Sequence, residues 1–308
     1  MKLSNFPYLI QKEILDHLFI NQLFFFSLCS KNTKNFIKET QKQQLKKIER
    51  VTYSINGLMH IKVKMANKSY ASVVMFLHKT KNEFQQCWGK VSVVQEVRVN
   101  ELATPIDLLR FRPPDYGLHV KYCPDTLESI MESIHSHLYD LLGNDTKYWM
   151  HSFDDDPNGG PAFLPMLMSI QRIDVLQKVI DPTKVDEFLD RSTSLEQLSW
   201  STINNRPFEL RENSKLYDLD SVYVYSIGRG ACSMANDVLK RFNGRHAFLQ
   251  SAEFDTSDVI QFLNEWKSGE KFTNLELISV DWRFNLQEIR NAVETKEVDR
   301  EVKYSFVR

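Results

Sequence analysis

The chain has few cysteines, and they are not grouped. Cys29, Cys87, Cys123 and Cys232 lie far apart, without the spacing of a disulfide framework or a metal site. The longest apolar run, Leu23–Cys29, is far shorter than a membrane-spanning helix, and no secretory hydrophobic segment is present. We therefore expect a soluble chain with free thiols and no membrane partner, located in the cytoplasm, the nucleus or both.

An excess of charge of either sign is also missing. The sequence carries 39 Lys and Arg against 40 Asp and Glu, which gives a net charge of −1 and a pI of about 6.7. Nucleic acids and anionic membranes attract proteins with a basic surplus, so we expect neither as a partner. The length of 308 residues allows two or more domains.

Motifs for catalysis or cofactor binding are absent as well. Gly228–Gly230 lies between a predicted strand and helix, as a dinucleotide loop would, but Ser233 takes the place of the third glycine. The acidic loop at 154–160 lacks the alternation and the closing glutamate of a calcium loop. His135 and His137 face apart on a helix. We expect no catalytic residue, cofactor or metal, and a small-molecule enzyme with its site at Gly228–Gly230 stays as an alternative.

The chain does have an apolar helical module at its N-terminus. Pro7 suits the first turn of a helix, and Ile10, Ile14 and Leu18 recur every four residues along one face. Ser30 is a suitable cap for a third helix. A module this short cannot bury so much apolar surface by itself, which favours a surface that binds a partner. The first helical corner of an ordinary domain is the alternative.

The module resembles the F-box in the order and spacing of Pro7, Ile14-Leu15, Leu18, Leu23 and Ser27-Leu28-Cys29. This short module docks substrate receptors onto the Skp-type linker of SCF ubiquitin ligases. The resemblance covers about residues 3–40, and Leu28–Lys34 is similar to the form found in large nematode F-box families. It implies that six residues face the linker: Pro7, Ile14, Leu15, Leu18, Leu23 and Leu28.

Residues 46–123 are predicted to be rich in strands. The expected strands have high β-propensity and lie between turn residues, which favours antiparallel pairing; they are Val51–Ile55, Met59–Met65, Ser72–Leu77, Val91–Val99 and Leu118–Tyr122. A helix is then predicted from Pro124 to Leu142, with Gly143 as its stop.

A degenerate repeat occupies much of the remaining chain. The pattern apolar-x-x-apolar-x-apolar recurs at starting positions 25, 24, 30 and 26 residues apart, and its members are Ile170/Ile173/Val175, Leu195/Leu198/Trp200, Leu219/Val222/Val224, Leu249/Ala252/Phe254 and Leu275/Ile278/Val280. Helical segments separate or follow the later members at Ala231–Phe242, Thr256–Lys267 and Leu286–Val293. Strand and helix alternating at this period are typical of a leucine-rich-repeat-like solenoid, so we expect the strands to be neighbours in one parallel sheet. A compact α/β domain with coincidental spacing is the alternative.

A second resemblance covers about residues 205–282. Segments such as Phe254–Trp266 and Asn274–Glu276 are similar to the type 2 F-box-associated domain, which nematode proteins carry C-terminal to an F-box. Its most distinctive part here is Leu263–Trp266, followed by Gly269 and Leu275. This resemblance implies a substrate receptor whose target the sequence does not name.

These observations predict a mixed α/β fold with three parts. They are a helical F-box at 1–45, a β-rich connecting region at 46–123, and a strand–helix repeat domain at 124–308 that forms a leucine-rich-repeat-like sheet. The predicted function is a non-catalytic substrate adaptor of an SCF-type ubiquitin ligase. It would bind the Skp-type linker, through it cullin, and an unknown protein substrate. A standalone leucine-rich-repeat-like interaction scaffold is the alternative.

For the substrate surface, the sequence singles out Tyr223, Tyr225 and Arg229. In such a repeat the helices cover one face of the sheet, and the other face or the loops are free for recognition. Tyrosine offers contact area at a low entropic cost, and arginine offers a fixed fork of donors. In the alternative interpretation, the tyrosines belong partly to the core and the arginine is only solvated.

Overall fold

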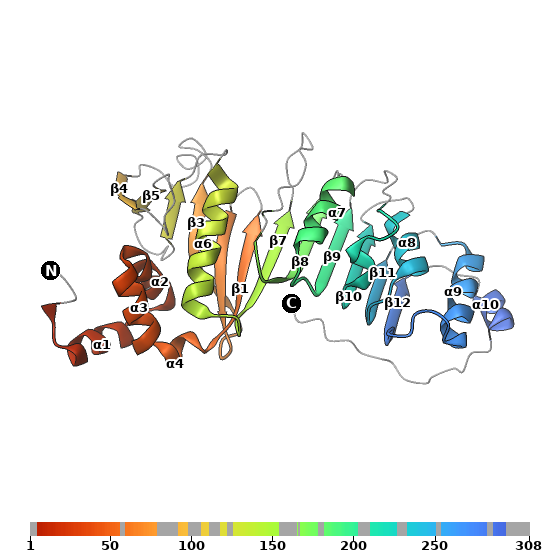
Figure 1. The fold of residues 1–308 in the computed structure, drawn as a ribbon, viewed down its shortest axis with the longest axis horizontal. Coiled ribbons are helices and arrows are strands. Elements are labelled where there is room, and N and C mark those ends of the chain that lie inside the picture. Colours follow the sequence, from red (N-terminus) through yellow and green to blue (C-terminus); the bar gives the residue numbers. More distant parts are fainter. Residues whose placement is uncertain are drawn as a thin grey trace.

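The structure is a computed structural model, and it describes residues 5–55, 59–78, 92–97, 106–110, 118–121, 126–153, 165, 167–177, 182–202, 210–226, 233–250, 254–281 and 286–293. Within these residues the strands form one 12-stranded sheet in the order β12-β11-β10-β9-β8-β7-β1-β2-β3-β6-β5-β4. The strands stand side by side along the length of the molecule, with the N-terminal helices towards one end (Figure 1). The N-terminal helices are α1 (Tyr8–Asp16), α2 (Ile20–Cys29), α3 (Lys31–Thr40) and the short α4 (Lys42–Leu45).

The first part of the sheet is mostly antiparallel, as expected. Its strands are β1 (Ile48–Ile55), β2 (Met59–Met65), β3 (Ala71–His78), β4 (Ser92–Val97), β5 (Ile106–Arg110) and β6 (Leu118–Lys121). β1, β2 and β3 pair antiparallel in chain order, whereas β3 and β6 are parallel. Strand β5 has no counterpart among the expected strands.

The second part of the sheet is parallel throughout. Its strands are β7 (Lys147–Phe153), β8 (Ile170–Gln177), β9 (Gln197–Thr202), β10 (Ser221–Ser226), β11 (His246–Gln250) and β12 (Leu277–Asp281). Each pairs in parallel with the next, and β7 pairs in parallel with β1. The predicted parallel arrangement is therefore confirmed for the repeat segments that contain Val175, Trp200, Val224 and Val280. The sheet also continues unbroken across the boundary expected near residue 123.

The position of the fourth repeat strand was predicted wrongly. The register pairs Ala247 and Leu249 of β11 with Val222 and Val224 of β10, so the repeat begins at residue 244 rather than at Leu249. Gly244 stands where the other repeats have leucine or isoleucine. A Cβ atom at this position would lie 1.9 Å from the carbonyl oxygen of Leu219, so the close approach of two backbones requires glycine here. Without its apolar first residue, this repeat is not recognisable in the sequence.

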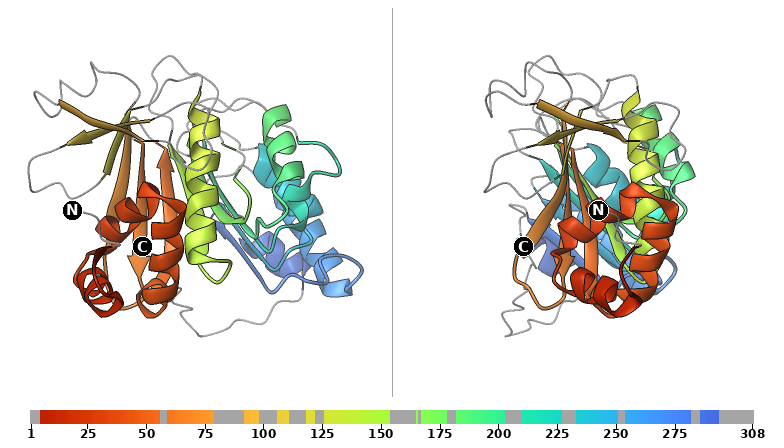
Figure 2. Two further views of the ribbon diagram at one scale, coloured as in Figure 1. Left: turned by 60° about the vertical axis from the view of Figure 1, so that its left-hand side comes forward. Right: turned by 90° about the vertical axis from the view of Figure 1, so that its left-hand side faces the viewer.

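Helices cover one face of the sheet. They are α6 (Leu127–Leu142), α7 (Pro182–Arg191), α8 (Ser233–Arg241) and α9 (Thr256–Ser268), while α10 (Leu286–Ala292) follows β12 and the 3₁₀ helix η3 (Lys215–Asp218) precedes β10. Seen along the sheet, the large helices lie on the same side of the strands (Figure 2). Strand residues that point to this side, such as Trp200, Val222 and Val224, are buried. Among the residues described, no helix has the length and apolar character needed to cross a membrane.

The N-terminal helices belong to the same core. Leu15, Leu23 and Ile37 are completely buried and join the hydrophobic cluster that continues to the repeat strands. Helix α2 packs on β3, and α3 packs beside α6. Within α3 the Ser30 side chain accepts a hydrogen bond from the Thr33 amide, as the predicted cap requires. The N-terminal module therefore has a fixed position on the sheet.

Helix α6 joins this module to the sheet through two buried histidines. The Tyr53 hydroxyl lies 2.8 Å from Nδ1 of His135, and the Ser27 hydroxyl lies 2.7 Å from Nε2 of His137. Burial raises the pKa of Tyr53 well above its usual value, so its hydroxyl keeps the proton and donates a hydrogen bond to the imidazole. At the surface above them, Asp140 forms ion pairs with Lys34 and Lys38 of α3.

Both histidines make stability dependent on pH. Burial lowers the pKa of each to about 4, with the nearby Lys34 adding to the effect at His137. In the unfolded chain the histidines titrate near pH 6.5. Between that pH and pH 4 the unfolded state therefore binds protons that the folded state does not bind, which favours unfolding. Their stabilising contribution is therefore complete above pH 6.5 and disappears as the pH falls towards 4. When the pH is lowered from 7.5 to 5, we expect the unfolding free energy to fall by about 2 kcal/mol for each histidine. Urea denaturation at the two pH values measures this change.

The variant His137→Gln removes one of the two titrating groups and should reduce this pH dependence by about half. His17→Gln is the matched control, because the His17 side chain is 75% exposed. An unchanged pH dependence in His137→Gln would show that His137 is not held neutral in the folded protein.

The close approach at Gly244 gives a second prediction. Gly244→Ala should lower the unfolding free energy by about 1–3 kcal/mol, because the new methyl group has no room beside Leu219 and Phe242. Gly269→Asn is the control: the position has φ of 72° and open space, and asparagine adopts the left-handed conformation readily. Equal stability of Gly244→Ala and the original protein would contradict the register of β10 and β11.

Candidate protein-interaction surfaces

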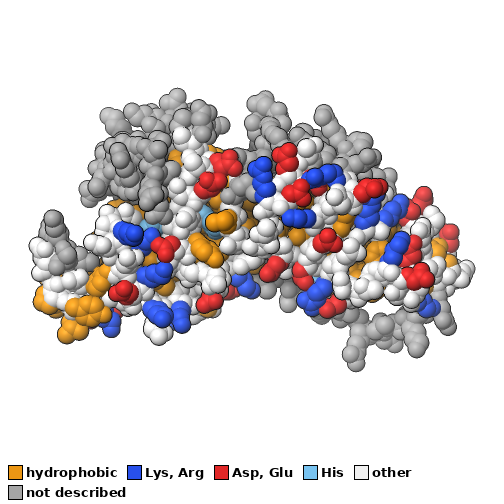
Figure 3. All heavy atoms as spheres, viewed as in Figure 1, with side chains coloured by type: hydrophobic (Ala, Val, Ile, Leu, Met, Phe, Trp, Pro, Cys, Tyr) orange, Lys and Arg blue, Asp and Glu red, His pale blue; other side chains and the backbone are white. Residues whose placement is uncertain are grey.

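The first candidate surface is an apolar tip formed by helix α1. Leu9 is 75% exposed and Phe19, just after the helix, is 68% exposed, and Tyr8, Ile10 and Ile14 are exposed as well. Figure 3 shows hydrophobic side chains gathered at the corner of the molecule where α1 lies. A contiguous group of large apolar side chains in water is typical of a protein-binding site.

Only part of the predicted linker-binding set lies on this tip. Pro7 and Ile14 are exposed, and Leu18 is partly buried against the core. Leu15, Leu23 and Leu28 are buried in the core, so their predicted place on an accessible face is wrong for this structure. These three leucines hold α1 and α2 on the sheet instead. Periodicity along a helix shows which residues share a face, but not which face the rest of the chain covers.

A hollow next to the tip extends this surface. Its volume is about 680 Å³, and it lies between the α1–α2 turn and strands β2 and β3. Phe19 and Tyr70, both largely exposed, stand among its lining residues. Leu9, Phe19 and Tyr70 were not predicted as surface residues of a binding site, because no pattern in the chain indicates that the core leaves them uncovered.

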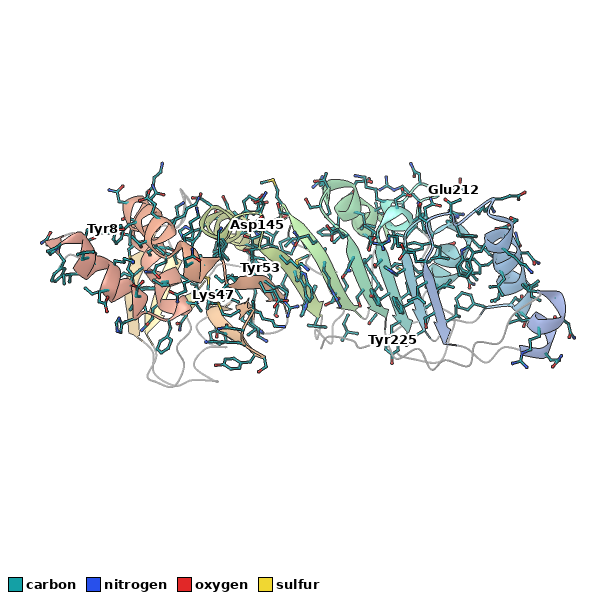
Figure 4. All side chains as sticks on the ribbon, turned by 90° about the horizontal axis from the view of Figure 1, so that it is seen from below. Tyr8, Lys47, Tyr53, Asp145, Glu212 and Tyr225 are labelled. Carbon is teal, nitrogen blue, oxygen red and sulfur yellow. The ribbon has the colours of Figure 1, made fainter. Side chains whose placement is uncertain are left out.

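The second candidate surface is the face of the sheet opposite the large helices, here called the open face. Strand side chains alternate between the two faces, so the residues next to the buried ones point to it. Tyr225, for example, is 40% exposed and points away from the helices (Figure 4). Register places Thr52, Trp149 and Arg172 in one row across β1, β7 and β8.

Aromatic and guanidinium groups form one continuous cluster on the open face. The Arg50 guanidinium lies 3.8 Å from the centroid of the Trp149 ring, and the Arg172 guanidinium lies 4.7 Å from it. Arg172 also lies 5.9 Å from the ring of Tyr223, which stacks on Phe248 at 4.4 Å. Such contacts stabilise the positions of cations and rings together. We call these five residues the arginine–aromatic cluster.

A carboxylate ties this cluster to a histidine. Asp174 accepts a hydrogen bond from Nε of Arg172 at 3.0 Å, and its other oxygen lies 3.0 Å from Nε2 of His151. Burial acts to raise the pKa of Asp174, but His151 and Arg172 outweigh it and lower that pKa. Asp174 therefore stays ionised and holds Arg172 in place.

Two of the three predicted substrate-binding residues, Tyr223 and Tyr225, belong to the described part of the chain. Tyr223 is half-buried within the arginine–aromatic cluster, and Tyr225 lies beside it on the open face. Arg229 and the Gly228–Gly230 turn lie outside the described residues. Arg50, Trp149 and Arg172 were missed, because they come from strands separated by many residues and only the register of β1, β7 and β8 brings them together.

One arrangement on the sheet has the residue types of a hydrolase triad. Ser221 Oγ lies 3.1 Å from Nδ1 of His246, and His246 lies near Asp220 and Glu276. Ser221 is only 1% exposed, so a substrate cannot reach it, and its hydroxyl donates a hydrogen bond to Asp220 instead of to His246. This group ties the beginnings of β10, β11 and β12 together. Among the described residues, no cluster of His, Cys, Asp and Glu is arranged to hold a metal ion.

Comparison with known proteins identifies the N-terminal module. No curated protein matches the chain by sequence. A family model described as F-box domain matches residues 3–42, which include helices α1, α2 and α3. F-box domains typically bind a Skp-type linker and generally belong to non-catalytic adaptors of SCF ubiquitin ligases. The match supports an F-box protein whose helical N-terminus is followed by a mixed α/β sheet.

Proposed function

We propose that this chain is a substrate-recognition adaptor of an SCF-type ubiquitin ligase. Its F-box binds the Skp-type linker, and through the linker cullin, while the C-terminal part of the sheet binds a protein substrate. The adaptor catalyses nothing itself. It raises the effective concentration of the substrate near the ubiquitin-charged enzyme.

The observation that carries this proposal is the apolar tip of α1 within the matched segment. Residues 3–42 match an F-box domain, and in that segment Leu9, Ile10 and Ile14 are exposed instead of joining the core. Exposed apolar area on a module that is otherwise well packed is consistent with a partner that covers it. The linker is the partner that F-box domains typically bind.

Several finer features belong to the same proposal. The F-box is of the nematode type, and residues 205–282 form a type 2 F-box-associated domain within a leucine-rich-repeat-like sheet. The domain limits are 1–45, 46–123 and 124–308, and the protein acts in the cytoplasm, the nucleus or both. The parallel strands β8 to β12 with helices on one side support the repeat interpretation.

Leu9→Asp tests the proposed linker surface. The substitution places a charge on the tip, where it would be buried unpaired against the linker, and should weaken linker binding at least about a hundredfold. Because Leu9 is exposed, the thermal stability of the isolated chain should remain unchanged. Titration calorimetry with a purified Skp-type linker measures the first effect, and thermal unfolding measures the second.

Lys12→Asp is the matched control, since Lys12 is exposed on the same helix and receives the same new side chain. It should retain linker binding. Unchanged affinity of Leu9→Asp would refute the tip as the linker site. Failure of the original protein to bind any Skp-type linker would instead favour the standalone interaction scaffold.

A further inference from the structure

We propose that the open face binds an extended acidic segment of a partner protein, with a carboxylate of that segment bound between Arg50 and Arg172. If this partner protein is the substrate of the ligase, that identification rests on the proposed function; the binding of an acidic segment does not. The charge of the open face, the geometry of its guanidinium groups and the aromatic residues beside them all favour such a partner.

Basic residues outnumber acidic ones on this part of the open face. Strand β2 presents Lys62 and Lys64 next to β1, where Arg50 pairs with Lys64 in the register, and Arg172 lies beyond Trp149. At the Tyr223 end of the cluster lies Asp220, which Arg245 pairs with at 3.5 Å. Around the two arginines, the neighbouring carboxylates in the described residues are Glu49, 3.8 Å from Lys64, and Asp174. Four cations thus face two carboxylates, in a chain whose net charge is −1. A partner with negative charge complements this surface.

The two arginines are held ready to bind a carboxylate. They approach Trp149 from the strands on its two sides, β1 and β8. A guanidinium that lies over a ring presents its N–H groups at its edge, where they match the two oxygens of a carboxylate. Nε of Arg50 is buried and Nε of Arg172 is already bound to Asp174, so a carboxylate of the partner would bind the terminal N–H groups of the two guanidinium ions. Burial lowers the pKa of Arg50 and Arg172 lowers it further, and these effects outweigh the opposing effect of Glu49 and Asp174, so an additional anion would stabilise the Arg50 charge.

The aromatic part of the cluster defines a second contact. Tyr223 and Phe248 lie on β10 and β11, and Arg172 lies on β8. The Arg172 guanidinium reaches to 5.9 Å from the Tyr223 ring, while the backbones of their strands, two spacings of about 4.8 Å apart, are separated by about 10 Å. An extended segment crossing the strands covers that distance in about three residues. The segment that fits best therefore has an acidic residue and, about three positions away, an aromatic one.

A peptide suits this surface better than a nucleic acid does. Single-stranded nucleic acids bind to basic grooves in which bases stack on free aromatic faces. Here the indole of Trp149 is already flanked by two guanidinium groups and offers no free face for a base. Asp174 lies within the same surface and would repel a continuous phosphate backbone.

The test measures peptide binding to the full chain by fluorescence anisotropy. The probe is a labelled peptide of about ten residues with two adjacent glutamates and a phenylalanine about three positions on. A peptide with glutamine in place of both glutamates is the comparison. We expect the acidic peptide to bind at least about tenfold more tightly than the glutamine peptide, and the double variant Arg50→Gln/Arg172→Gln to lose that difference.

Arg191→Gln is the matched control, because it removes the same charge from an exposed position on helix α7 and should retain binding. Arg50→Lys keeps the charge but not the planar fork, and should weaken binding several-fold. Circular dichroism shows whether the double variant folds. If it does not, Arg50→Lys tests the proposal in its place. Linker binding is measured on the same preparations, so a failure of the proposed function is seen separately.

Equal binding of the two peptides, or no binding of the acidic peptide, would overturn the proposal. So would a double variant that folds and binds as the original protein does. Binding only when phosphoserine replaces the glutamates would overturn the carboxylate assignment. Tighter binding of a single-stranded oligonucleotide through the same arginines would assign the face to nucleic acid instead.

Discussion

The burial of helix α6 between the N-terminal helices and the sheet holds both candidate surfaces in one geometry. On one side His135 meets Tyr53 of the sheet, and on another His137 meets Ser27 of α2. Each contact is a hydrogen bond between buried groups, and breaking one would leave a polar atom without a partner in the core. The F-box helices therefore cannot turn on the sheet without a substantial loss of free energy.

The open face follows from the way the parallel strands are connected. Consecutive parallel strands joined by right-handed crossovers place their helices on the same side of the sheet. The described helices α7, α8 and α9 do so, and the side chains on the opposite side include the arginine–aromatic cluster. The same connection rule that forms the core thus leaves one face of the sheet without these helices.

In the proposed adaptor, rigidity has a direct use. A substrate held on the open face and a linker held on the tip of α1 would be related by packed secondary structure instead of a flexible segment. The effective concentration of the substrate near the ligase then depends on a fixed distance, with little entropy to be lost on each encounter. The ion pairs of Asp140 with Lys34 and Lys38 add to this connection at the surface.

Local patterns in the sequence determined much of the fold. Strand β2 has the predicted bounds, α6 ends at Gly143 as expected, and the repeat strands are parallel neighbours. These features depend on propensity, turn residues and periodicity, which are written in neighbouring residues. The F-box was also identifiable, because its signal lies within one short segment.

Tertiary structure alone decided which side chains of these elements are exposed at the surface and can contact a partner. Leu15 and Leu9 lie on the same helix, but packing on the sheet buries the first and exposes the second. Gly244 replaces a leucine of the repeat because the carbonyl of Leu219, just before β10, occupies the space. Arg50, Trp149 and Arg172 meet only through the register of three strands far apart in the chain. Contacts of this kind depend on long-range pairing, for which a single sequence has no local signal.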